Sequence, residues 1–346
     1  MPEEWRKILI MKPSSLGDIV MALPVLSALR KTFANTRISW LVRPEFAPLL
    51  KIHPYVDEVI VFDRKLLGKA WRSWAGLKEL RSLIGGLRGA RFDAIIDLQG
   101  LFRTGALSWL SGCRRRFGMA ESRELAHLFY TDNVPPDADK PHMVDYYLKI
   151  AHAAGASEAD VEFVFGEDRR AGEGVAALLR RQGFSDAGYA VIIPGSAHAD
   201  KCWPIENFAA VADRVANDFA LRIIATGTAS ERDTVEKLRE IAHTDVVNLA
   251  GRTGLVELVE ILRKAALVLG NDTGPSHIAA AIGRPAVLVY GCSNPARVGP
   301  YTQNACAVAN KPESRGREFK SDNPDYDIAK VCVEQVYSSV CERLSG

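Results

Sequence analysis

The sequence has no long apolar run and no large excess of charge of one sign. No stretch approaches the roughly 20 apolar residues that cross a bilayer, and the apolar run at 8–11 is shorter than the core of a signal peptide. Lys plus Arg number 44 and Asp plus Glu 42, a formal net charge of +2, which argues against a dedicated nucleic-acid-binding protein. We therefore expect a cytoplasmic protein that is soluble or at most attached to a membrane surface.

The motifs of several cofactor and metal sites are also missing. The six cysteines form no Cys-x-x-Cys pair and have no zinc-binding spacing, so we expect reduced thiols rather than a disulfide framework. No Gly-x-Gly-x-x-Gly follows the first predicted strand, and the chain has no Gly-x-x-x-x-Gly-Lys-Ser/Thr loop. A nicotinamide-dependent dehydrogenase or a nucleotide-sugar epimerase is therefore disfavoured, and neither a cofactor nor a metal is expected.

The sequence does have a regular alternation of short apolar runs and longer amphipathic segments over 346 residues, enough for about two domains. This alternation predicts βαβ units and an α/β fold with two doubly wound parallel sheets. The predicted strands are 7–11, 38–42, 58–62, 94–98, 189–193, 221–226, 246–249, 267–269 and 286–290. The predicted helices are 19–33, 71–87, 102–110, 142–154, 205–217, 230–242, 255–263, 275–282 and 328–344. Ligands of such sheets bind outside the carboxyl ends of the strands, so the loops that follow strands are the places for chemistry.

The loop after the first strand ends at Asp18. Ser14 and Ser15 offer hydroxyl groups there, and Gly17 permits a tight turn. Asp18 has two interpretations. It can be a first-turn carboxylate that the helix dipole favours. It can also be a general base at the edge of the sheet, kept ionised by the helix N-terminus.

Two loops of the second half could bind phosphate or ribose groups. In the loop 194–204, Ser196 and Lys201 could hold phosphate oxygens, although an ordinary connecting loop has the same composition. In the loop 227–231, Glu231 could accept hydrogen bonds from ribose hydroxyls, but a first-turn glutamate is common for dipole reasons alone.

A third loop, 271–277, combines a helix start with polar side chains. Asp272 or Thr273 would cap the helix, whose free N–H groups after Gly274 form an anion site. His277 lies on the first turn near the same site. A capped helix without a ligand remains the alternative.

The segment 64–91 carries most of the excess positive charge of the first half. It has eight basic residues and one acidic residue, Glu79, with Trp71 and Trp74 between them. A solvated helix face explains such a segment, and so does a surface for an anionic partner such as an acidic lipid headgroup.

Four segments together resemble the motifs of a known family. They are Ser-x-x-Gly-Asp at 14–18, Asp-Leu-Gln-Gly and its continuation at 97–107, Lys-x-Trp-Pro at 201–204, and Asp-Thr-Gly-x-x-His-x-x-Ala-Ala within 271–285. In this order and spacing, over nearly the whole chain, they resemble the bacterial ADP-heptose:lipopolysaccharide heptosyltransferases of glycosyltransferase family 9, most closely those that add the first heptose.

The resemblance implies a GT-B architecture, in which two Rossmann-like domains face a central cleft. An acceptor-binding domain is expected at 1–165 and a nucleotide-sugar-binding domain at 166–326. A final helix at 327–346 is expected to pack back on the first domain. The implied reaction is an inverting, metal-independent transfer of heptose from ADP-heptose to the Kdo-lipid A inner core of lipopolysaccharide.

The resemblance also implies roles for single residues. Asp18 would be the base that deprotonates the acceptor hydroxyl. The donor-binding residues would be Ser196, Lys201, Glu231, Thr253, Asp272, Thr273, Gly274 and His277. The acceptor-binding residues would be Ser14, Ser15, Arg64, Lys65, Arg103 and Arg123.

The implied partners are ADP-heptose and the anionic Kdo-lipid A acceptor. The protein would then be attached peripherally to the inner face of the cytoplasmic membrane. The sequence does not reveal the oligomeric state, and we expect a monomer. Two alternatives stay open. One is a heptosyltransferase II or another family member with a different acceptor, and the other is a nucleotide-sugar-binding Rossmann protein without catalytic activity.

Overall fold

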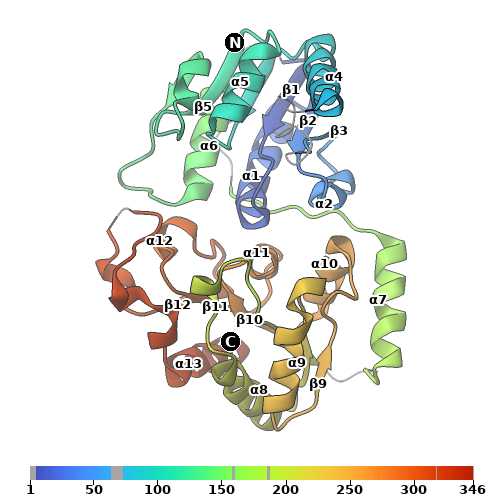
Figure 1. Ribbon diagram of the computed structural model, residues 1–346, viewed down its shortest axis with the longest axis vertical. Helices are drawn as coiled ribbons and strands as arrows, with labels where there is room; N and C mark the ends of the chain where they lie inside the picture. The colour runs from blue at the N-terminus through green and yellow to red at the C-terminus, as the bar shows by residue number, and fades with distance from the viewer. Residues whose placement is uncertain (1–4, 64–72, 158–159, 185–187, 317, 346) are drawn as a thin grey trace. The chain divides into compact units, whose positions relative to one another are not determined.

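The chain folds into two compact units, Met1–Glu167 and Asp168–Gly346. The computed structural model describes residues 5–63, 73–157, 160–184, 188–316 and 318–345. Figure 1 shows that each unit is a sheet with helices around it. The boundary between the two units lies at 167/168, two residues after the boundary of 165/166 expected from the sequence.

The first unit is a parallel sheet of order β3-β2-β1-β4-β5-β6. Its strands are β1 (Lys7–Met11), β2 (Arg37–Val42), β3 (Glu58–Val61), β4 (Ala94–Asp97), β5 (Arg115–Met119) and β6 (Asp132–Val134). Its helices are α1 (Leu16–Thr32), α2 (Ala47–Lys51), α4 (Trp74–Ala90), α5 (Phe102–Leu110) and α6 (Met143–Ala153), with a 3-10 turn η1 (Ala126–Phe129). The apolar runs of β1 and β4 are fully buried, as expected for central strands covered on both faces.

The second unit repeats this plan, with the order β12-β11-β10-β7-β8-β9. Its strands are β7 (Tyr189–Ile193), β8 (Arg222–Ala225), β9 (Val246–Asn248), β10 (Leu267–Asn271), β11 (Ala286–Tyr290) and β12 (Ala305–Ala309). Its helices are α7 (Arg169–Arg181), α8 (Ile205–Phe219), α9 (Arg232–Ile241), α10 (Leu255–Lys264), α11 (Gly274–Ala281), α12 (Pro295–Val298) and α13 (Val333–Ser345). Short 3-10 turns η2 (Ala199–Lys201) and η3 (Ala229–Glu231) precede α8 and α9.

Each sheet has one point at which the strand order reverses. In the first unit it lies between β1 and β4, where Met11 pairs with Asp97. In the second unit it lies between β7 and β10, where Ile193 pairs with Gly270. Loops diverge at such a switch point and leave room for a ligand. The loops after β1, β4, β7 and β10 are therefore the ones that the fold brings to a binding position.

The final helix packs in the core of its own unit. The apolar side chains of α13, Val336, Tyr337 and Val340, are buried in the core of the second unit. The Tyr337 hydroxyl donates to Asp218 of α8, and the guanidinium of Arg214 lies 3.5 Å from the centre of the Tyr337 ring. The sheet of its own unit thus covers the apolar face of α13, and the expected packing of this helix on the first domain stays a prediction.

Several elements were absent from the sequence prediction. The strands β5, β6 and β12 (RRFGM, DNV and ACAVA) contain charged, polar or small residues instead of an apolar run. The helix predicted at 71–87 begins at Trp74, because the Ser73 hydroxyl accepts a hydrogen bond from Gly76 N at 3.0 Å and caps it. In the part of the chain that the structure describes, no helix is both long and apolar enough to span a bilayer.

Candidate active site

The second unit brings a lysine, an aspartate and a histidine together at its switch point. Lys201 Nζ lies 2.5 Å from Asp272 Oδ2, and His277 Nε2 lies 3.0 Å from Asp272 Oδ1. Asp272 and His277 are buried, whereas a quarter of the Lys201 side chain is exposed (25%). The carboxylate therefore anchors a lysine whose ammonium can still approach an anionic ligand.

Charges around Asp272 keep its carboxyl group ionised. Burial by itself raises the pKa of Asp272, but its hydrogen bond with His277 and the charges of His277 and Lys201 outweigh burial and hold that pKa well below the usual range. Burial, and then the Asp272 charge, raise the pKa of Tyr290, so this phenol stays protonated. The buried carboxylate of Asp272 thus provides a fixed negative charge next to the Lys201 ammonium.

A buried amide joins the two loops that carry these residues. Asn271 Nδ2 donates to Pro194 O at 2.8 Å, and Trp203 N donates to Asn271 Oδ1 at 3.0 Å. The Trp203 indole in turn donates to Val331 O at 2.8 Å. Gly270 allows β10 to lie close to both β7 and α11, since a Cβ there would lie 2.9 Å from Ile193 Cβ and 2.5 Å from Ser276 Oγ. The loop after β7 is therefore fastened to the end of β10, which fixes Lys201 against Asp272.

The start of α11 supplies backbone donors beside this lysine. Thr273 is the residue before the helix, and Gly274 and Pro275 are its first residues. Thr273 Oγ1 lies 3.2 Å from Ser276 Oγ. N–H groups in the first turn of a helix have no partner within the helix and attract anions. The predicted anion site of 271–277 is thus adjacent to Lys201, which is held by Asp272 of the same loop.

The other predicted donor residues lie on neighbouring loops. Glu231 Oε2 accepts hydrogen bonds from Thr228 N at 2.6 Å and from Thr228 Oγ1 at 2.8 Å. This side chain lies against the backbone beside Ser196, since a Cβ on Gly195 would come within 2.4 Å of Glu231 Oε1. Ser196 Oγ accepts from His198 N at 3.3 Å. Glu231 therefore has the helix-start role that was its alternative interpretation, and it also faces the phosphate-loop candidate.

Thr253 lies on the next loop along the same edge. Gly251 N donates to Gly227 O at 2.9 Å, which joins the loops after β8 and β9. Gly251 has φ +69°, and a Cβ there would meet the backbone of Ala229 at 2.8 Å, so the close approach needs glycine. Thr253 is half-buried two residues further on. The three loops with Ser196, Glu231 and Thr253 thus follow the adjacent strands β7, β8 and β9.

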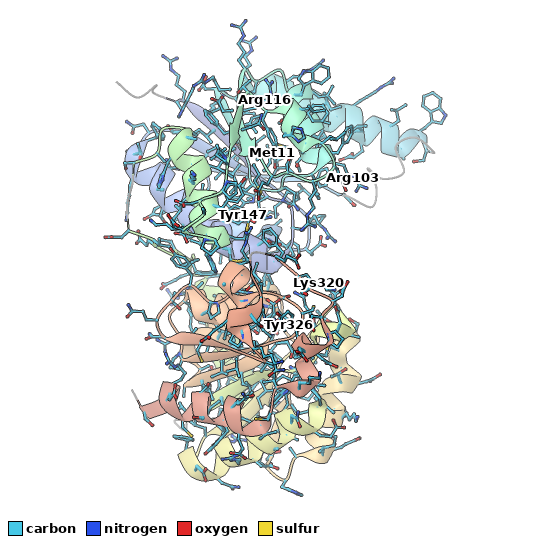
Figure 2. All side chains as sticks on the ribbon, turned by 90° about the vertical axis from the view of Figure 1, so that its left-hand side faces the viewer. Met11, Arg103, Arg116, Tyr147, Lys320 and Tyr326 are labelled. Carbon is cyan, nitrogen blue, oxygen red and sulfur yellow. The ribbon has the colours of Figure 1, made fainter. Side chains whose placement is uncertain are left out.

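In the first unit, Asp18 lies at the switch point with several hydrogen-bond donors. Asp18 Oδ2 accepts from Ser15 N at 3.0 Å and from Ser15 Oγ at 2.6 Å. The Asp18 charge also acts on the buried phenol of Tyr147 of α6, labelled in Figure 2, and helps to raise its pKa. Lys12, the residue after β1, places Nζ 3.8 Å from Asp18 Oδ1. Asp18 is therefore a helix-start carboxylate, as one interpretation predicts, and also a half-exposed charged group at a ligand position, as the other requires.

A second carboxyl group of the same unit, that of Asp97, is fully buried at the end of β4. Asp97 accepts hydrogen bonds from the Tyr130 hydroxyl at 2.8 Å and from Gln99 N at 2.9 Å. Burial raises the pKa of Asp97, and these hydrogen bonds oppose the rise. The motif at 97–107 therefore acts as a scaffold for its own loop, with Asp97 closing the turn that begins at Leu98.

Most of the chain matches one enzyme family. The model of glycosyltransferase family 9 (heptosyltransferase) matches residues 80–327. The chain belongs to glycosyltransferase family 9. Lipopolysaccharide heptosyltransferase 1 of Salmonella typhimurium is 30% identical over 343 residues, and the match covers 96% of this chain and 99% of that protein. Lipopolysaccharide core heptosyltransferase OpsX of Haemophilus influenzae is 28% identical over 324 residues, with 92% and 88% covered.

Solved structures agree with this membership. E. coli heptosyltransferase WaaC with ADP has a TM-score of 0.77 and 27% identity, and the alignment covers 97% of this chain and 99% of that one. A glycosyltransferase family 9 structure from Veillonella parvula has the same fold, with a TM-score of 0.84 at 24% identity and 100% and 99% coverage. The predicted GT-B fold and the predicted heptosyltransferase family are confirmed. This family 9 enzyme therefore uses a nucleotide-sugar donor.

The structure places four of the six predicted acceptor residues. Ser15 holds Asp18, and Ser14 N donates to Gln99 Oε1 at 3.3 Å. Arg103, the second residue of α5, has an exposed side chain (Figure 2), and Arg123 is also exposed, with a charge that acts on Lys12 and Tyr147. The other two predicted acceptor residues, Arg64 and Lys65, lie outside the described residues.

Sequence reasoning missed three residues of these sites. Lys12 and Asn271 directly follow apolar strand runs, a position that places a polar side chain at the ligand edge of a sheet. That signal was available. No such signal marks Tyr147, because this residue lies within a helix of ordinary amphipathic pattern. It comes near Asp18 only through the packing of α6 along α1.

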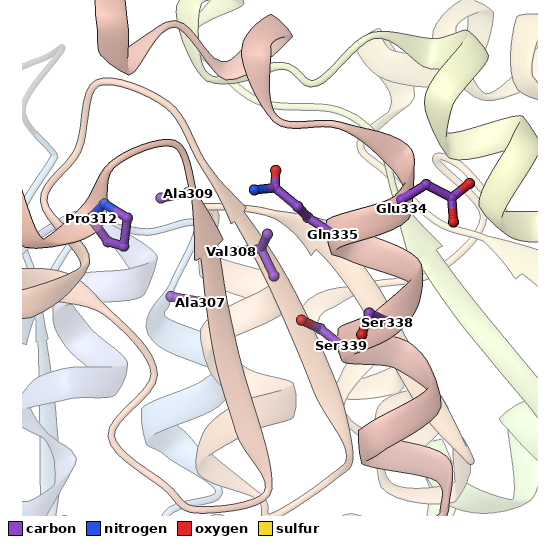
Figure 3. A pocket seen from close by; sticks show the side chains of 8 residues that line it. All are labelled: Ala307, Val308, Ala309, Pro312, Glu334, Gln335, Ser338 and Ser339. Atoms are coloured by element: carbon purple, nitrogen blue, oxygen red, sulfur yellow. The ribbon is translucent and has the colours of Figure 1, made fainter.

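A hollow of about 470 Å³ lies elsewhere in the second unit, against the edge strand β12 and α13 (Figure 3). It is lined by Ala307, Val308, Ala309, Pro312, Glu334, Gln335, Ser338 and Ser339. Its one carboxylate, Glu334, already pairs with Arg214 at 2.8 Å. None of the donor-site residues lines it. Among the described residues, no group of three or more His, Cys, Asp and Glu could hold a metal ion.

Proposed function

We propose that this family 9 enzyme transfers heptose from ADP-heptose, with inversion and without a metal ion, to a Kdo-lipid A acceptor in lipopolysaccharide core assembly. The observation that carries the proposal is the pair of half-sites. A carboxylate suited to a base stands at the switch point of one unit, and a lysine with a helix start stands at that of the other. The names of the relatives support the choice of sugar and acceptor, since several are lipopolysaccharide heptosyltransferases 1.

The chemistry needs one base and stabilisation of one leaving group. Asp18 takes the proton of the acceptor hydroxyl, whose oxygen attacks the anomeric carbon of heptose from the face opposite ADP. The new C–O bond forms as the bond from the anomeric carbon to the β-phosphate oxygen breaks, and ADP departs. Lys201 and the N–H groups at the start of α11 stabilise the charge that develops on this phosphate. One carboxylate suffices, because inversion passes through no covalent enzyme intermediate.

The donor half-site fits an adenosine diphosphate in its order along the sheet edge. Phosphate ligands, Ser196 and Lys201, follow β7, and the carboxylate of Glu231, which could take a ribose hydroxyl, follows β8. Thr253, proposed to lie near the adenine, follows β9. One of the similar solved structures is WaaC with ADP-2-deoxy-2-fluoro heptose, at 27% identity and a TM-score of 0.76, which supports this donor.

The experiment that tests the function is acceptor-dependent release of ADP from ADP-heptose. We expect release with Kdo-lipid A and much slower release with an acceptor that already carries the first heptose. The reverse preference would move the assignment to the second heptose, as in the Salmonella relative named heptosyltransferase 2, which is 26% identical. Nucleotide binding without release on any acceptor would support the non-catalytic alternative and overturn the proposal.

A basic face on α4 supports peripheral attachment to an anionic membrane. Trp74 is 85% exposed, and Lys78, Arg81 and Arg88 follow it along one side of the helix at helical spacing. The opposite apolar residues of α4 pack into the core of the first unit. An exposed tryptophan with interleaved basic side chains is the pattern by which helices bind anionic lipid surfaces.

Charge reversal on this face tests the attachment. In the variant with Lys78→Glu and Arg81→Glu, we expect the KM for Kdo-lipid A in anionic vesicles to rise by about 10-fold or more, since each basic residue near such a surface contributes roughly 1 kcal/mol. The KM for ADP-heptose stays unchanged. The matched control carries Arg180→Glu and Arg181→Glu, the same charge change on exposed residues of α7. If both variants bind vesicles like the parent protein, α4 is only a solvated face.

A further inference from the structure

A buried lysine stands beside the proposed base. The Lys12 side chain is 4% exposed, and its Nζ lies 3.8 Å from Asp18 Oδ1. This distance is longer than a hydrogen bond, so Lys12 acts on the carboxylate mainly through its charge. Its backbone is fixed as well, because the Trp40 indole donates to Lys12 O at 3.1 Å.

Tyr147 joins the same cluster from α6. Lys12 Nζ lies 5.1 Å from the centre of the Tyr147 ring, within the range of a cation–π contact. Burial, followed by the Asp18 charge, raises the pKa of the Tyr147 phenol. The phenol therefore stays protonated and can donate a hydrogen bond. Lys12 and Tyr147 thus surround the base from two elements that are distant in sequence.

Other charged groups face this cluster from the remaining elements. Asp97 of β4 and Asp18 both favour the protonated form of Lys12, while burial and Arg123, in the loop after β5, oppose it and lower the pKa of Lys12 overall. Arg123 also opposes the rise of the Tyr147 pKa. Burying an ammonium costs free energy unless a partner compensates it. A lysine kept at the buried end of β1 therefore needs a reason beyond packing.

We propose that Lys12 and Tyr147 are positioning residues for Asp18: the charge of Lys12 keeps the carboxylate ionised when an acceptor covers it, and the Tyr147 hydroxyl fixes its orientation. This inference rests on the proposed role of Asp18 as the base. When the acceptor displaces water, the ionised carboxylate loses solvation, and the nearby ammonium replaces part of it. Since Lys12 stands beyond hydrogen-bonding distance, it provides this charge without occupying the oxygen as a close donor would.

The test is the pH dependence of kcat in Lys12→Met, which removes the charge but keeps an unbranched side chain. Without the ammonium, the ionised form of Asp18 is less favoured and its pKa in the enzyme–substrate complex rises. The acid limb of the kcat profile should therefore move to higher pH by about 1 unit. The dissociation constant for ADP, whose site lies in the other unit, should stay within about twofold of the parent value. Lys12→Arg keeps the charge and should keep the limb closer to that of the parent.

Two further variants make the result unambiguous. Tyr147→Phe loses only the donor, so kcat should fall about 10-fold and the acid limb should again move up, because a hydrogen bond to the ionised form is lost. This variant decides the matter if Lys12→Met does not fold. Lys31→Met is the matched control, since Lys31 is a half-exposed lysine paired with Glu162 at 2.8 Å, and its profile should equal that of the parent.

The outcomes separate this inference from the proposed function. If the parent enzyme shows acceptor-dependent release and Asp18→Asn loses it, while the acid limbs of Lys12→Met and Tyr147→Phe match the parent, then both residues are merely structural and the inference is overturned. If the parent enzyme shows no release, the function itself fails, whatever the variants do.

Discussion

Asp18→Asn should lower kcat by about 10²–10⁴-fold, the usual contribution of a general base, with the KM for ADP-heptose nearly unchanged. Asparagine keeps the shape of the side chain, and its carbonyl oxygen can still accept from Ser15 N. It cannot take up the acceptor proton. Rapid-quench measurement of ADP formation with saturating acceptor gives kcat directly, and calorimetric titration of ADP shows whether the donor half-site is intact.

The control for this variant is another carboxylate in the same helix position. Glu257 is the third residue of α10, and its Oε2 accepts from Gly254 N at 2.7 Å, as Asp18 accepts from Ser15 N. Glu257→Gln keeps an acceptor for Gly254 N and loses only the charge at the helix start, so it should cost about 0.3–1 kcal/mol of stability and leave kcat unchanged. If Asp18→Asn behaves in the same way, Asp18 is a capping residue only. Asp18→Asn is expected to lose additional stability, because Lys12 then stays buried without its carboxylate.

Lys201→Met should lower kcat by about 10²–10³-fold, the range seen when a preorganised electrostatic donor is removed. The ammonium, held by Asp272 at 2.5 Å, is placed to stabilise the departing diphosphate. Asp272 keeps its hydrogen bond to His277 in the variant, so the loop after β10 keeps its anchor. Affinity for ADP should fall by about 10-fold, whereas affinity for AMP, which lacks the β-phosphate, should change little.

This difference between the two nucleotides distinguishes a phosphate ligand from a structural lysine. A lysine that only compensates Asp272 would, when replaced, weaken both nucleotides equally through a general loosening of the site. Lys237→Met provides the comparison, because Lys237 is an exposed lysine of α9 paired with Glu206 at 3.1 Å, and neither nucleotide should bind it differently from the parent.

The sequence could predict where the strands end, but it could not predict which strands lie side by side in the sheet. Lys201 and Asp272 lie in loops that follow predicted strands, and His277 lies on the first turn of the helix after the second of these loops, so each was a candidate. That Asp272 bridges the other two depends on β7 and β10 being adjacent, which the chain order conceals because β8 and β9 intervene. Tyr147 is hidden for the same kind of reason, since it meets Asp18 only when α6 packs along α1.

The final helix shows a second limit of prediction from the sequence, since its buried face could be predicted but not the surface that covers it. Its apolar positions, Val336, Tyr337 and Val340, form a readable stripe, and the stripe is buried as predicted. An apolar stripe predicts that another surface covers it, but it does not identify that surface. The sheet of the second unit was available nearest along the chain, and α13 packs on β10, β11, β12 and α8.

The division of the chain at 167/168 has a consequence for how such enzymes diversify. Gly166 lies so close to Ile52 that a Cβ would come within 1.8 Å of its carbonyl oxygen, and Asp168 caps α7 by accepting from Ala171 N at 3.0 Å. The chain thus passes from one unit to the other within two residues, because Gly166 packs in the first unit and Asp168 caps a helix of the second. All eight proposed donor residues fall after this boundary, and the proposed base falls before it. Exchange of the first 167 residues between relatives would then replace the proposed base and acceptor-binding residues together. The donor-binding residues of the second unit would stay unchanged.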